Sequence, residues 1–451
     1  MAAINMEDAS GYPGRADSLY SPSSEAELLQ LLRDASEQVI PVTIVGARTG
    51  LAGGAMPEGG WAISMERFRT LDVRSGEATV GAGVLLRDLQ FAATRSGQFY
   101  APDPTENLSS IGGNIACNAS GSRSFRFGDT RRSVKRLRVA LMDGSVLDLG
   151  RGQRVPFAIP LLPRPSTTKF SAGFPLEPGM DFVDLFVGSE GVLGVVTEAV
   201  VELLPAPKAL LSGVVFFPAE EAALDAVEAW RGLGQLRMLE YADTSSLNLL
   251  RSRKVDMPAS AGAALLIESD SAGDDEVDAW LDRLEAAGAM LEESWFGLTA
   301  EDRERFRVFR HALPEAVNDT VRRRGFQKMG TDFAVPIPRN REMIAYYRQL
   351  LDSDYRGDAV IYGHIGDAHV HVNLLPKDAE EVARGKAVIL EFARHAVELG
   401  GVVAAEHGLG KRKRHLLALQ WSPEQLDAMK ALKRRFDPQW LLGRGTLLSD
   451  D

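Results

Sequence analysis

Glycine-rich loops that follow short apolar runs constrain the fold of the first 200 residues more than any other feature. Val42–Val45 predicts a short buried strand, and the loop Gly46–Gly54 follows it directly. Three more glycine-bearing segments lie at 102–121, 127–128 and 188–198. Glycine lets backbone N–H groups approach an anionic group closely, so the loops predict a cradle for an anionic ligand. The competing interpretation is that they are ordinary turns.

Common nucleotide and hydrolase loops do not fit these segments. The first loop has the spacing G-x-x-x-G-x-x-G, which is not the dinucleotide pattern G-x-G-x-x-G, and no clear helix follows it. No P-loop pattern occurs, and Val187–Gly191 lacks one glycine of the G-x-S-x-G nucleophile turn. The sequence therefore indicates neither an NAD site nor a hydrolase.

Composition argues against several classes of protein. The chain has 51 Lys and Arg against 62 Asp and Glu, a formal charge of −11, which argues against a nucleic-acid partner. Cys117 is the single cysteine, so an internal disulfide or a four-thiolate metal site cannot form. No signal-peptide pattern opens the chain, and no uncharged apolar run approaches about 20 residues. We expect a cytoplasmic protein without a membrane span; peripheral attachment to an inner membrane stays open.

Apolar periodicity predicts an α+β chain. Ser24–Ser36 has helical spacing, with Ser23 or Ser24 as the cap. Strands are predicted at Ala62–Met65, Ala78–Val84, Leu137–Met142, Val146–Leu149, Asp184–Val187 and Val195–Leu204, with a hairpin turn at Asp143–Ser145. Six prolines between Val155 and Met180 predict an irregular loop.

Pro205 and Pro207 mark the best domain boundary, because two prolines in three residues resist both a helix and a central strand. Strands are then predicted at Leu211–Phe217, Met238–Tyr241, Ala263–Glu268, Asp332–Val335 and Val360–His364, and helices at Glu220–Arg231, Asp275–Ala286, Glu301–Asp319, Arg341–Leu351 and from Ala379 onward. Such alternation is typical of a ferredoxin-like layer. We expect three parts, at 1–205, 206–390 and 391–451, the last one helical.

Three of the seven histidines fall within eight residues. His364 precedes a turn signal at 366–367, and His369, His371 and Asn373 follow it. Strand alternation places the last three on one face, and His364 can lie across from them. Converging imidazoles suit Zn, Fe or Mn, whereas the alternative is a polar face of stacked histidines.

The four glycine segments together, in this order, resemble the flavin domain of the vanillyl-alcohol oxidase and p-cresol methylhydroxylase superfamily. The resemblance implies a two-part FAD-binding domain. It places the pyrophosphate on Gly46, Ala47, Arg48, Thr49, Gly50 and Leu51. It places the ribityl chain and ring against Pro102, Asp103, Thr105, Gly112, Gly113, Asn114, Asn118 and Gly121. Val195 and its neighbours would meet the adenine side, and Gly128, Gly191 and Gly194 complete the expected cofactor set.

Some positions depart from that family pattern. Ala47 and Arg48 stand where relatives usually have glycines; Arg48 either contacts a phosphate or points to solvent. Some relatives attach FAD through His or Cys, but the first loop contains no His. Cys117 stands where the pattern has a small residue, which favours packing over a tether. We therefore expect non-covalent FAD.

Glu406 and His407 form a second polar patch, and adjacent side chains point apart, so the two would do different jobs. With the histidine hairpin they resemble the C-terminal domain of FAD-linked D-2-hydroxy-acid dehydrogenases: D-lactate dehydrogenases, the glycolate oxidase flavin subunit and D-2-hydroxyglutarate dehydrogenase. The resemblance implies a divalent metal, Zn with Fe or Mn as alternatives, on His364, His371 and Glu406, with His407 as base. His369 replaces an Asn of the family pattern and could be a fourth ligand.

The same resemblance suggests the remaining catalytic residues. Arg310 stands where the family binds the substrate carboxylate, although a surface arginine on a charged helix would also explain it. Lys328 lies near the family's lysine, with a spacing to the following residues that is off by two, and Asn373 ends the histidine pattern. Gly443–Thr446 differs from the Asn-Pro-Gly-Lys of many relatives.

Together these features suggest FAD-dependent oxidation of a small D-2-hydroxy acid to a 2-oxo acid. The metal would bind the hydroxyl group, His407 would take its proton, Arg310 would clamp the carboxylate, and the hydride would pass to flavin N5. A quinone, a cytochrome or an electron-transfer flavoprotein would accept the electrons, and a homodimer is possible. Three other classes stay open: a flavin subunit of a larger oxidase that is inactive alone, a flavin transferase of the alkylglycerone-phosphate synthase type, and a glycine-rich binding module without activity.

Overall fold

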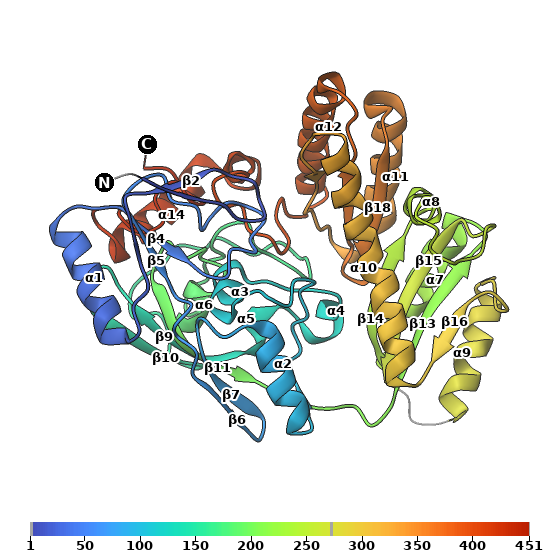
Figure 1. Ribbon diagram of the computed structural model, residues 1–451, viewed down its shortest axis with the longest axis horizontal. Helices are drawn as coiled ribbons and strands as arrows, with labels where there is room; N and C mark the ends of the chain where they lie inside the picture. Colours follow the sequence, from blue (N-terminus) through green and yellow to red (C-terminus); the bar gives the residue numbers. More distant parts are fainter. Residues whose placement is uncertain (1–2, 271–273, 451) are drawn as a thin grey trace.

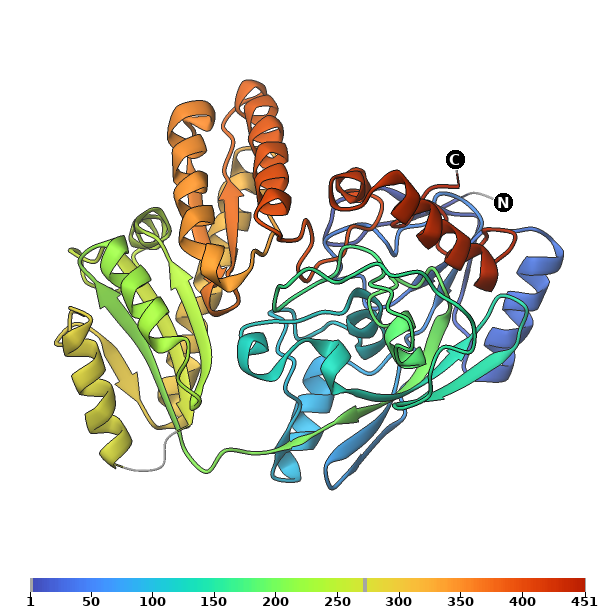
Figure 2. The same cartoon turned by 180° about the vertical axis from the view of Figure 1, so that it is seen from behind.

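The computed structural model of the protein describes residues 3–270 and 274–450. Helices and strands form two lobes (Figure 1, Figure 2). Both ends of the chain lie side by side on the first lobe, and the chain leaves that lobe near 206–209 and returns to it near 400. The predicted α+β class is confirmed, because helices pack on sheets in both lobes.

Two sheets build the first lobe. A five-stranded antiparallel sheet has the order β10-β9-β11-β7-β6, and a three-stranded parallel sheet has the order β3-β5-β4. Their strands are β3 (Ser18–Tyr20), β4 (Val42–Val45), β5 (Trp61–Ser64), β6 (Leu71–Arg74), β7 (Glu77–Gly81), β9 (Val134–Ala140), β10 (Val146–Gly150) and β11 (Val195–Glu202). Two-stranded pairs add β1 (Ile4–Met6) with β2 (Gly14–Ala16), and β8 (Gln98–Phe99) with β12 (Leu204–Pro205).

Helices of the first lobe cover these sheets and frame the loops. The predicted first helix is α1 (Glu25–Glu37), and the Ser24 hydroxyl caps it by accepting from the Glu27 N–H. Its buried residues Leu28, Leu32 and Ala35 pack with the parallel sheet. The other helices are α2 (Leu86–Arg95), α3 (Ile111–Cys117), α4 (Ser124–Phe127), α5 (Thr130–Ser133), α6 (Phe182–Phe186), α13 (Leu417–Gln420) and α14 (Pro423–Phe436).

A seven-stranded antiparallel sheet forms the second lobe, in the order β16-β13-β15-β14-β18-β19-β17. Its strands are β13 (Leu210–Phe217), β14 (Leu236–Ala242), β15 (Ala263–Asp270), β16 (Trp295–Gly297), β17 (Met329–Gly330), β18 (Ala359–His364) and β19 (His369–Leu374). Its helices are α7 (Glu220–Trp230), α8 (Thr244–Ser252), α9 (Asp274–Ala286), α10 (Ala300–Arg323), α11 (Asn340–Leu350) and α12 (Ala379–Glu398). β18 and β19 carry the histidines and lie toward the first lobe.

Two sequence predictions of local structure are wrong. The expected strand Asp184–Val187 lies at helix α6, whose apolar side chains Phe182, Val183, Leu185 and Phe186 are all buried. A short apolar run has no periodicity that separates a buried strand from a buried helix. The expected strand Asp332–Val335 is extended backbone with a single bridge, from Ala334 to Val402. The predicted irregular loop at 155–180 holds no helix or strand of its own.

The last residues of the chain complete the first lobe. The N–H of Val42 donates to the carbonyl of Leu441 at 2.8 Å, and the N–H of Gly443 donates to the carbonyl of Val42 at 2.8 Å. The Thr446 hydroxyl donates to the carbonyl of Gly54 at 3.1 Å. The C-terminal segment therefore holds both the strand before the first glycine loop and the end of that loop. Among the described residues, no helix has the length and apolarity to cross a bilayer.

Candidate active site

The predicted histidine hairpin is present, and it points toward the first lobe. β18 and β19 pair antiparallel, with His364 opposite His369 and Tyr362 opposite His371. Ring centroids lie 5.4 Å apart for His364 and His369, and 4.5 Å apart for His369 and His371. The tight turn between the strands therefore gathers three imidazoles on one patch.

Glu406 brings a carboxylate to two of these imidazoles. Its Oε1 lies 3.1 Å from Nε2 of His364 and 3.3 Å from Nε2 of His371. One ligand atom from each of these residues and from His369 fits within 4.8 Å. Imidazole nitrogen and carboxylate oxygen are ligands that Zn and related divalent metals accept. This donor set fits a metal.

Hydrogen bonds fix the tautomers of the two imidazoles that face Glu406. Nδ1 of His364 bonds Oε1 of Glu240 at 2.6 Å, and Nδ1 of His371 bonds the carbonyl oxygen of Thr331 at 3.0 Å. Each Nδ1 therefore carries a proton, which leaves Nε2 as the nitrogen that faces Glu406 and that a metal would bind in place of a proton. Metal-bound histidines use the same outer contacts.

Burial and neighbouring charges act in opposite directions on the pKa values of His364 and Glu240. Burial disfavours the charged imidazole, but the Glu240 carboxylate outweighs it and raises the pKa of His364 to about 9. Burial likewise opposes the charged form of Glu240, but the charges of His364 and Arg310 outweigh it and lower the pKa of Glu240 to about 2. Arg310 contacts Glu240 directly, with Nε 3.1 Å from Oε2. The carboxylate is therefore ionised and shared by the two cations.

Two donors hold the second oxygen of Glu406. Oε2 accepts from the Lys169 ammonium at 3.0 Å and from the Ser120 hydroxyl at 2.9 Å. Lys169 is fully buried, and its Nζ also lies 3.5 Å from Oδ2 of Asp367 and 3.4 Å from Nδ1 of His369. The carboxylate is therefore fixed with Oε1 toward the two imidazoles.

His407 lies beside the cluster, with Nε2 3.7 Å from Oε1 of Glu406. Its ring stacks on His371, with centroids 5.4 Å apart and planes at 13°. Nδ1 lies 3.5 Å from Oδ1 of Asp332, and the carboxylate of Asp332 accepts the His407 backbone N–H at 2.9 Å. Burial lowers the pKa of His407 to about 4, against the pull of Asp332. The imidazole is neutral near pH 7, as a proton acceptor must be.

The glycine loops line one cavity, and that cavity reaches His407 and Glu406. Of the residues expected to bind FAD, its wall includes Gly46, Ala47, Arg48, Thr49, Gly50, Leu51, Thr105, Gly112, Gly113, Asn114, Gly191, Gly194 and Val195. An added Cβ at Gly50 or Gly191 would meet no atom within 4 Å, and Gly191 has φ +73°. The buried amide nitrogen of Asn114 has no hydrogen-bond partner in the described chain. Exposed backbone and an unpaired donor fit a polar cofactor such as FAD.

The other residues expected at the cofactor lie outside this cavity wall. Asn118 is buried; its amide donates to Asp129 at 2.8 Å and to the Phe170 carbonyl at 3.0 Å. Gly121 packs so closely on Asp103 that an added Cβ would lie 1.9 Å from its carbonyl oxygen. Pro102 precedes Asp103 in the same segment. These residues shape the backbone behind the loops.

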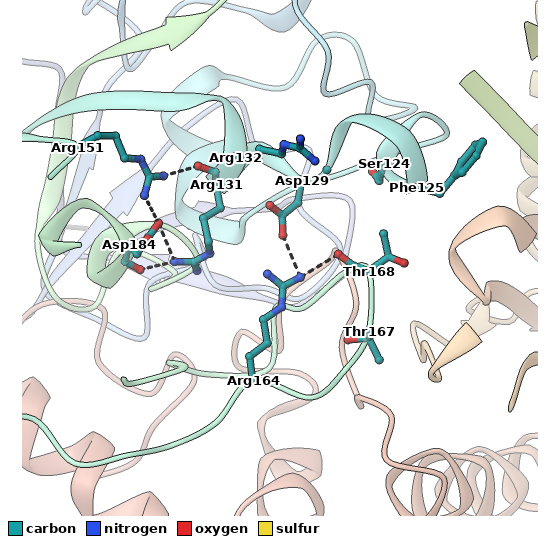
Figure 3. Close-up of a pocket in the computed structure, with 11 residues that line it drawn as sticks. Ser124, Phe125, Asp129, Arg131, Arg132, Arg151, Arg164, Thr167, Thr168 and Asp184 are labelled. Carbon is teal, nitrogen blue, oxygen red and sulfur yellow. Dashed lines mark hydrogen bonds and ion pairs between the residues drawn. The ribbon is translucent and has the colours of Figure 1, made fainter. Parts of the chain in front are cut away.

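Gly128 lines a second cavity of about 550 Å³. Figure 3 shows three arginines of this cavity turned toward carboxylates and backbone. Arg151 contacts Asp184 at 2.7 Å, and Arg164 contacts Asp129 at 3.4 Å and the Thr168 carbonyl at 2.8 Å. Arg131 donates to the carbonyl of Asp184. Arg164 therefore ties the proline-rich loop to Asp129, and Arg131 and Arg151 hold helix α6.

The remaining catalytic candidates surround the cluster. Asn373 is buried on β19, and its amide nitrogen lies 3.4 Å from the His371 carbonyl oxygen. Lys328 precedes β17, where burial and then Lys413 lower its pKa to about 8.

Burial raises the pKa of the Cys117 thiol to about 12, which agrees with a packing role.

Comparison with known proteins identifies the family. The family model described as "FAD linked oxidases, C-terminal domain" matches residues 206–447, and the "FAD binding domain" model matches residues 16–150. The chain belongs to the FAD-linked oxidases. This FAD-linked oxidase is 30% identical over 459 residues to the "Glycolate oxidase subunit GlcD" of Bacillus subtilis (strain 168), covering 98% of this chain and 90% of that one.

Two further likenesses agree with the assignment. The oxidase is 29% identical over 454 residues to the "D-lactate dehydrogenase" of Anaerostipes hadrus, covering 96% of this chain and 90% of the relative. Its fold resembles a solved alkyldihydroxyacetonephosphate synthase, with a TM-score of 0.66, 16% identity, and coverage of 94% of this chain and 76% of that one. At this identity the second likeness shows the fold alone. The FAD-binding domain and the C-terminal domain of FAD-linked oxidases are therefore both present.

Sequence reasoning missed three residues of the oxidase site: Lys169, Glu240 and Asp332. Glu240 gave a usable signal, because a carboxylate in the middle of an apolar strand requires a buried partner. Asp332 fell in a segment that looked like an ordinary strand. Lys169 lies in the proline-rich loop, where no periodicity indicates its contacts.

Proposed function

We propose that this FAD-linked oxidase converts a small D-2-hydroxy acid into the 2-oxo acid, with glycolate, D-lactate and D-2-hydroxyglutarate as candidate substrates. One observation carries the proposal: Glu406 and His407 form part of the same cavity wall as the glycine loops. A ligand in that cavity would meet a neutral base and a metal ligand next to the cofactor loops. The relatives named above act, by their names, on glycolate or D-lactate.

His364, His371 and Glu406 would hold the divalent metal, with Zn as first choice and Fe or Mn as alternatives. Two Nε2 atoms with fixed tautomers and one carboxylate oxygen supply the three donors. Three protein ligands leave coordination positions for substrate oxygens. A bound divalent cation would lower the pKa of the substrate hydroxyl group.

His407 would remove the hydroxyl proton at Nε2. Asp332 faces Nδ1 and accepts the backbone N–H of the same residue, so it fixes both the ring and the main chain. The low pKa of the ring, about 4, keeps Nε2 free to accept a proton near pH 7. FAD, when bound, supplies the acceptor for the two electrons that leave the substrate Cα as hydride.

Arg310 and Lys328 would bind the substrate carboxylate, and Asn373 would orient it. Arg310 uses Nε for Glu240, so its terminal nitrogens can present a planar fork to a carboxylate. Because Glu240 also holds His364, the carboxylate site and the metal would share one anchor. A 2-hydroxy acid offers both groups, the carboxylate to Arg310 and the hydroxyl to the metal.

A flavin subunit of a larger oxidase is the second candidate, because one relative is named as a subunit. A quinone, a cytochrome or an electron-transfer flavoprotein would then take the electrons. The domain division at 205 and 390 stays a prediction; in the structure, the 391–451 part crosses back to the first lobe. A flavin-dependent transferase is less well supported, because group transfer would leave the histidine and carboxylate cluster without a catalytic role.

A substrate screen tests the proposal. Purified protein is mixed anaerobically with D- and L-isomers of lactate and 2-hydroxyglutarate and with glycolate, and flavin absorbance is followed, with an artificial dye as final acceptor. We expect D-isomers or glycolate to bleach the flavin and the L-isomers to leave it oxidised. Bleaching by L-isomers alone, or by none of the acids, would contradict the proposal. Bleaching without dye turnover would favour the subunit candidate.

A further inference from the structure

His369 is held differently from the two histidines beside it. It is fully buried, with Nδ1 3.4 Å from the Lys169 ammonium and Nε2 3.2 Å from Oδ1 of Asp332. His364 and His371, in contrast, direct Nδ1 toward a carboxylate or a carbonyl oxygen. Nδ1 of His369 therefore faces a hydrogen-bond donor, whereas Nδ1 of His364 and of His371 faces an acceptor.

An ammonium beside Nδ1 decides which nitrogen carries the proton. Lysine ammonium has three donors and no acceptor, and Lys169 stays charged because Glu406 and Asp367 lie within 3.5 Å. Nδ1 of His369 must therefore offer its lone pair to Lys169. A neutral imidazole has one lone pair and one N–H, so Nε2 carries the hydrogen and has no lone pair left for a metal.

Nε2 faces Asp332, which supports the base. The 3.2 Å approach is a charge–dipole contact rather than an aligned hydrogen bond, because Nε2 has no partner that meets hydrogen-bond geometry in the described chain. Asp332 in turn accepts the backbone N–H of His407 at 2.9 Å. A bridge therefore runs from Lys169 through His369 and Asp332 to His407.

We propose that His369 is a positioning residue and not a metal ligand. It bridges Lys169 and Asp332 as the Nε2–H tautomer and thereby steadies Asp332 against His407. This inference rests on the metal cluster and base of the proposed function. It predicts a metal set of three protein ligands, His364, His371 and Glu406.

An amide can perform the same bridging task. The carbonyl of asparagine accepts from an ammonium and its NH2 group donates to a carboxylate, which matches the two faces of His369. A leucine fills similar space with neither function. His369→Asn should therefore preserve what His369→Leu loses.

The tautomer can be measured without any activity. Protein with ¹⁵N-labelled histidine is examined by NMR, metal-free and after one equivalent of Zn, and the His369 signals are assigned by their loss in His369→Asn. We expect Nε2 of His369 to be protonated in both states, while Nε2 of His364 and His371 shifts on Zn addition. A deprotonated Nε2 in His369, or a coordination shift there, overturns the inference.

Metal affinity and kinetics give the second measurement. Zn affinity, from competition with a chelator, should change less than about 3-fold in His369→Asn, whereas His371→Asn should lose at least about 10-fold, the low end of outer-contact effects. His369→Leu should lower kcat with KM and flavin content unchanged, and His369→Asn should restore kcat. A loss of Zn affinity in His369→Asn equal to that in His371→Asn contradicts the inference. Protein that shows the expected tautomer but oxidises no hydroxy acid contradicts only the proposed function.

Discussion

Glu240 accepts a hydrogen bond from Nδ1 of His364 at 2.6 Å, and this contact ties the centre of β14 to the histidine hairpin. Its other oxygen holds Nε of Arg310 at 3.1 Å. A single buried carboxylate therefore orients one candidate metal ligand and one candidate substrate ligand. Neither could shift without disturbing the other.

Replacing Glu240 should weaken the metal site without unfolding the lobe. In Glu240→Gln, the amide keeps the shape but loses the charge that makes His364 a strong donor, so we expect Zn affinity to fall about 10- to 100-fold. Competition with a chelator measures this. Glu268→Gln is the matched control, because its carboxylate pairs with Arg123 and Arg237 instead. Equal Zn affinity in Glu240→Gln and wild type would show that the contact does not tune the metal.

Flavin should be retained by the glycine loops alone. The protein should be yellow as purified, and acid precipitation should release the flavin into the supernatant, because we expect non-covalent binding. Asn114→Ala should lower flavin occupancy, since its buried amide has no protein partner and is available to the cofactor. Asn107→Ala, at an exposed position, is the control. Flavin that stays with the precipitate would mean a covalent link.

Chelation should remove the metal and leave the flavin bound. The proposed metal ligands lie on β18, β19 and the loop at 406, and of these only Glu406 reaches the cavity that the glycine loops line. Removing the metal should abolish turnover and leave the yellow colour. Elemental analysis confirms the removal, and Glu406→Gln should reproduce the effect. Full activity in metal-free protein would assign the histidine cluster a structural role.

The base can be tested independently of both cofactors. His407→Asn should reduce kcat by about 10²- to 10⁴-fold, the usual contribution of a general base. Metal content should stay at the wild-type value, because His407 is not one of the three proposed metal ligands, and flavin content measures whether its place in the cavity wall matters for the cofactor. Steady-state kinetics with the preferred acid, alongside elemental and absorbance analysis, gives all three readings. A loss below about 10-fold would place the proton acceptor elsewhere.

Stability should depend on pH through Glu190. Burial raises the pKa of its carboxyl group to about 7, although the N–H groups of Leu409 and Gly410 lower it. A raised folded-state pKa means that the folded protein takes up a proton more readily, so this contribution to the free energy of unfolding falls as pH rises from about 4.5 through 7.

Glu190→Gln removes that titration. The difference in unfolding free energy between wild type and variant should move by up to about 3 kcal/mol in favour of the variant between pH 5 and pH 8. Urea unfolding at several pH values measures it, with Glu301→Gln, on the exposed start of α10, as the control. A difference that is constant with pH would contradict the raised pKa.

Much of the fold could be predicted because local patterns carry it. The helix α1, the β9–β10 hairpin and the β18–β19 hairpin each follow from periodicity and a turn signal within a few residues. Helix α6 could not be separated from a strand, because a five-residue segment with four buried side chains carries no readable period.

The site was predictable where residues are neighbours in sequence and not where they meet only in space. His364 and His371 were found together because one turn joins them. Lys169 contacts Glu406 across 237 positions, and its loop carries no periodic signal. The resemblance placed Glu406 at the metal, but nothing in the sequence indicated which cation would hold its second oxygen.

The bonds from Leu441 and Gly443 to Val42 have a consequence for how the protein is made. A ribosome delivers Val42 and the first glycine loop about 400 residues before their partners exist. Until the last residues emerge, this strand has an open edge and the loop lacks its support. Cofactor loading should therefore wait until residues 441–446 have been made.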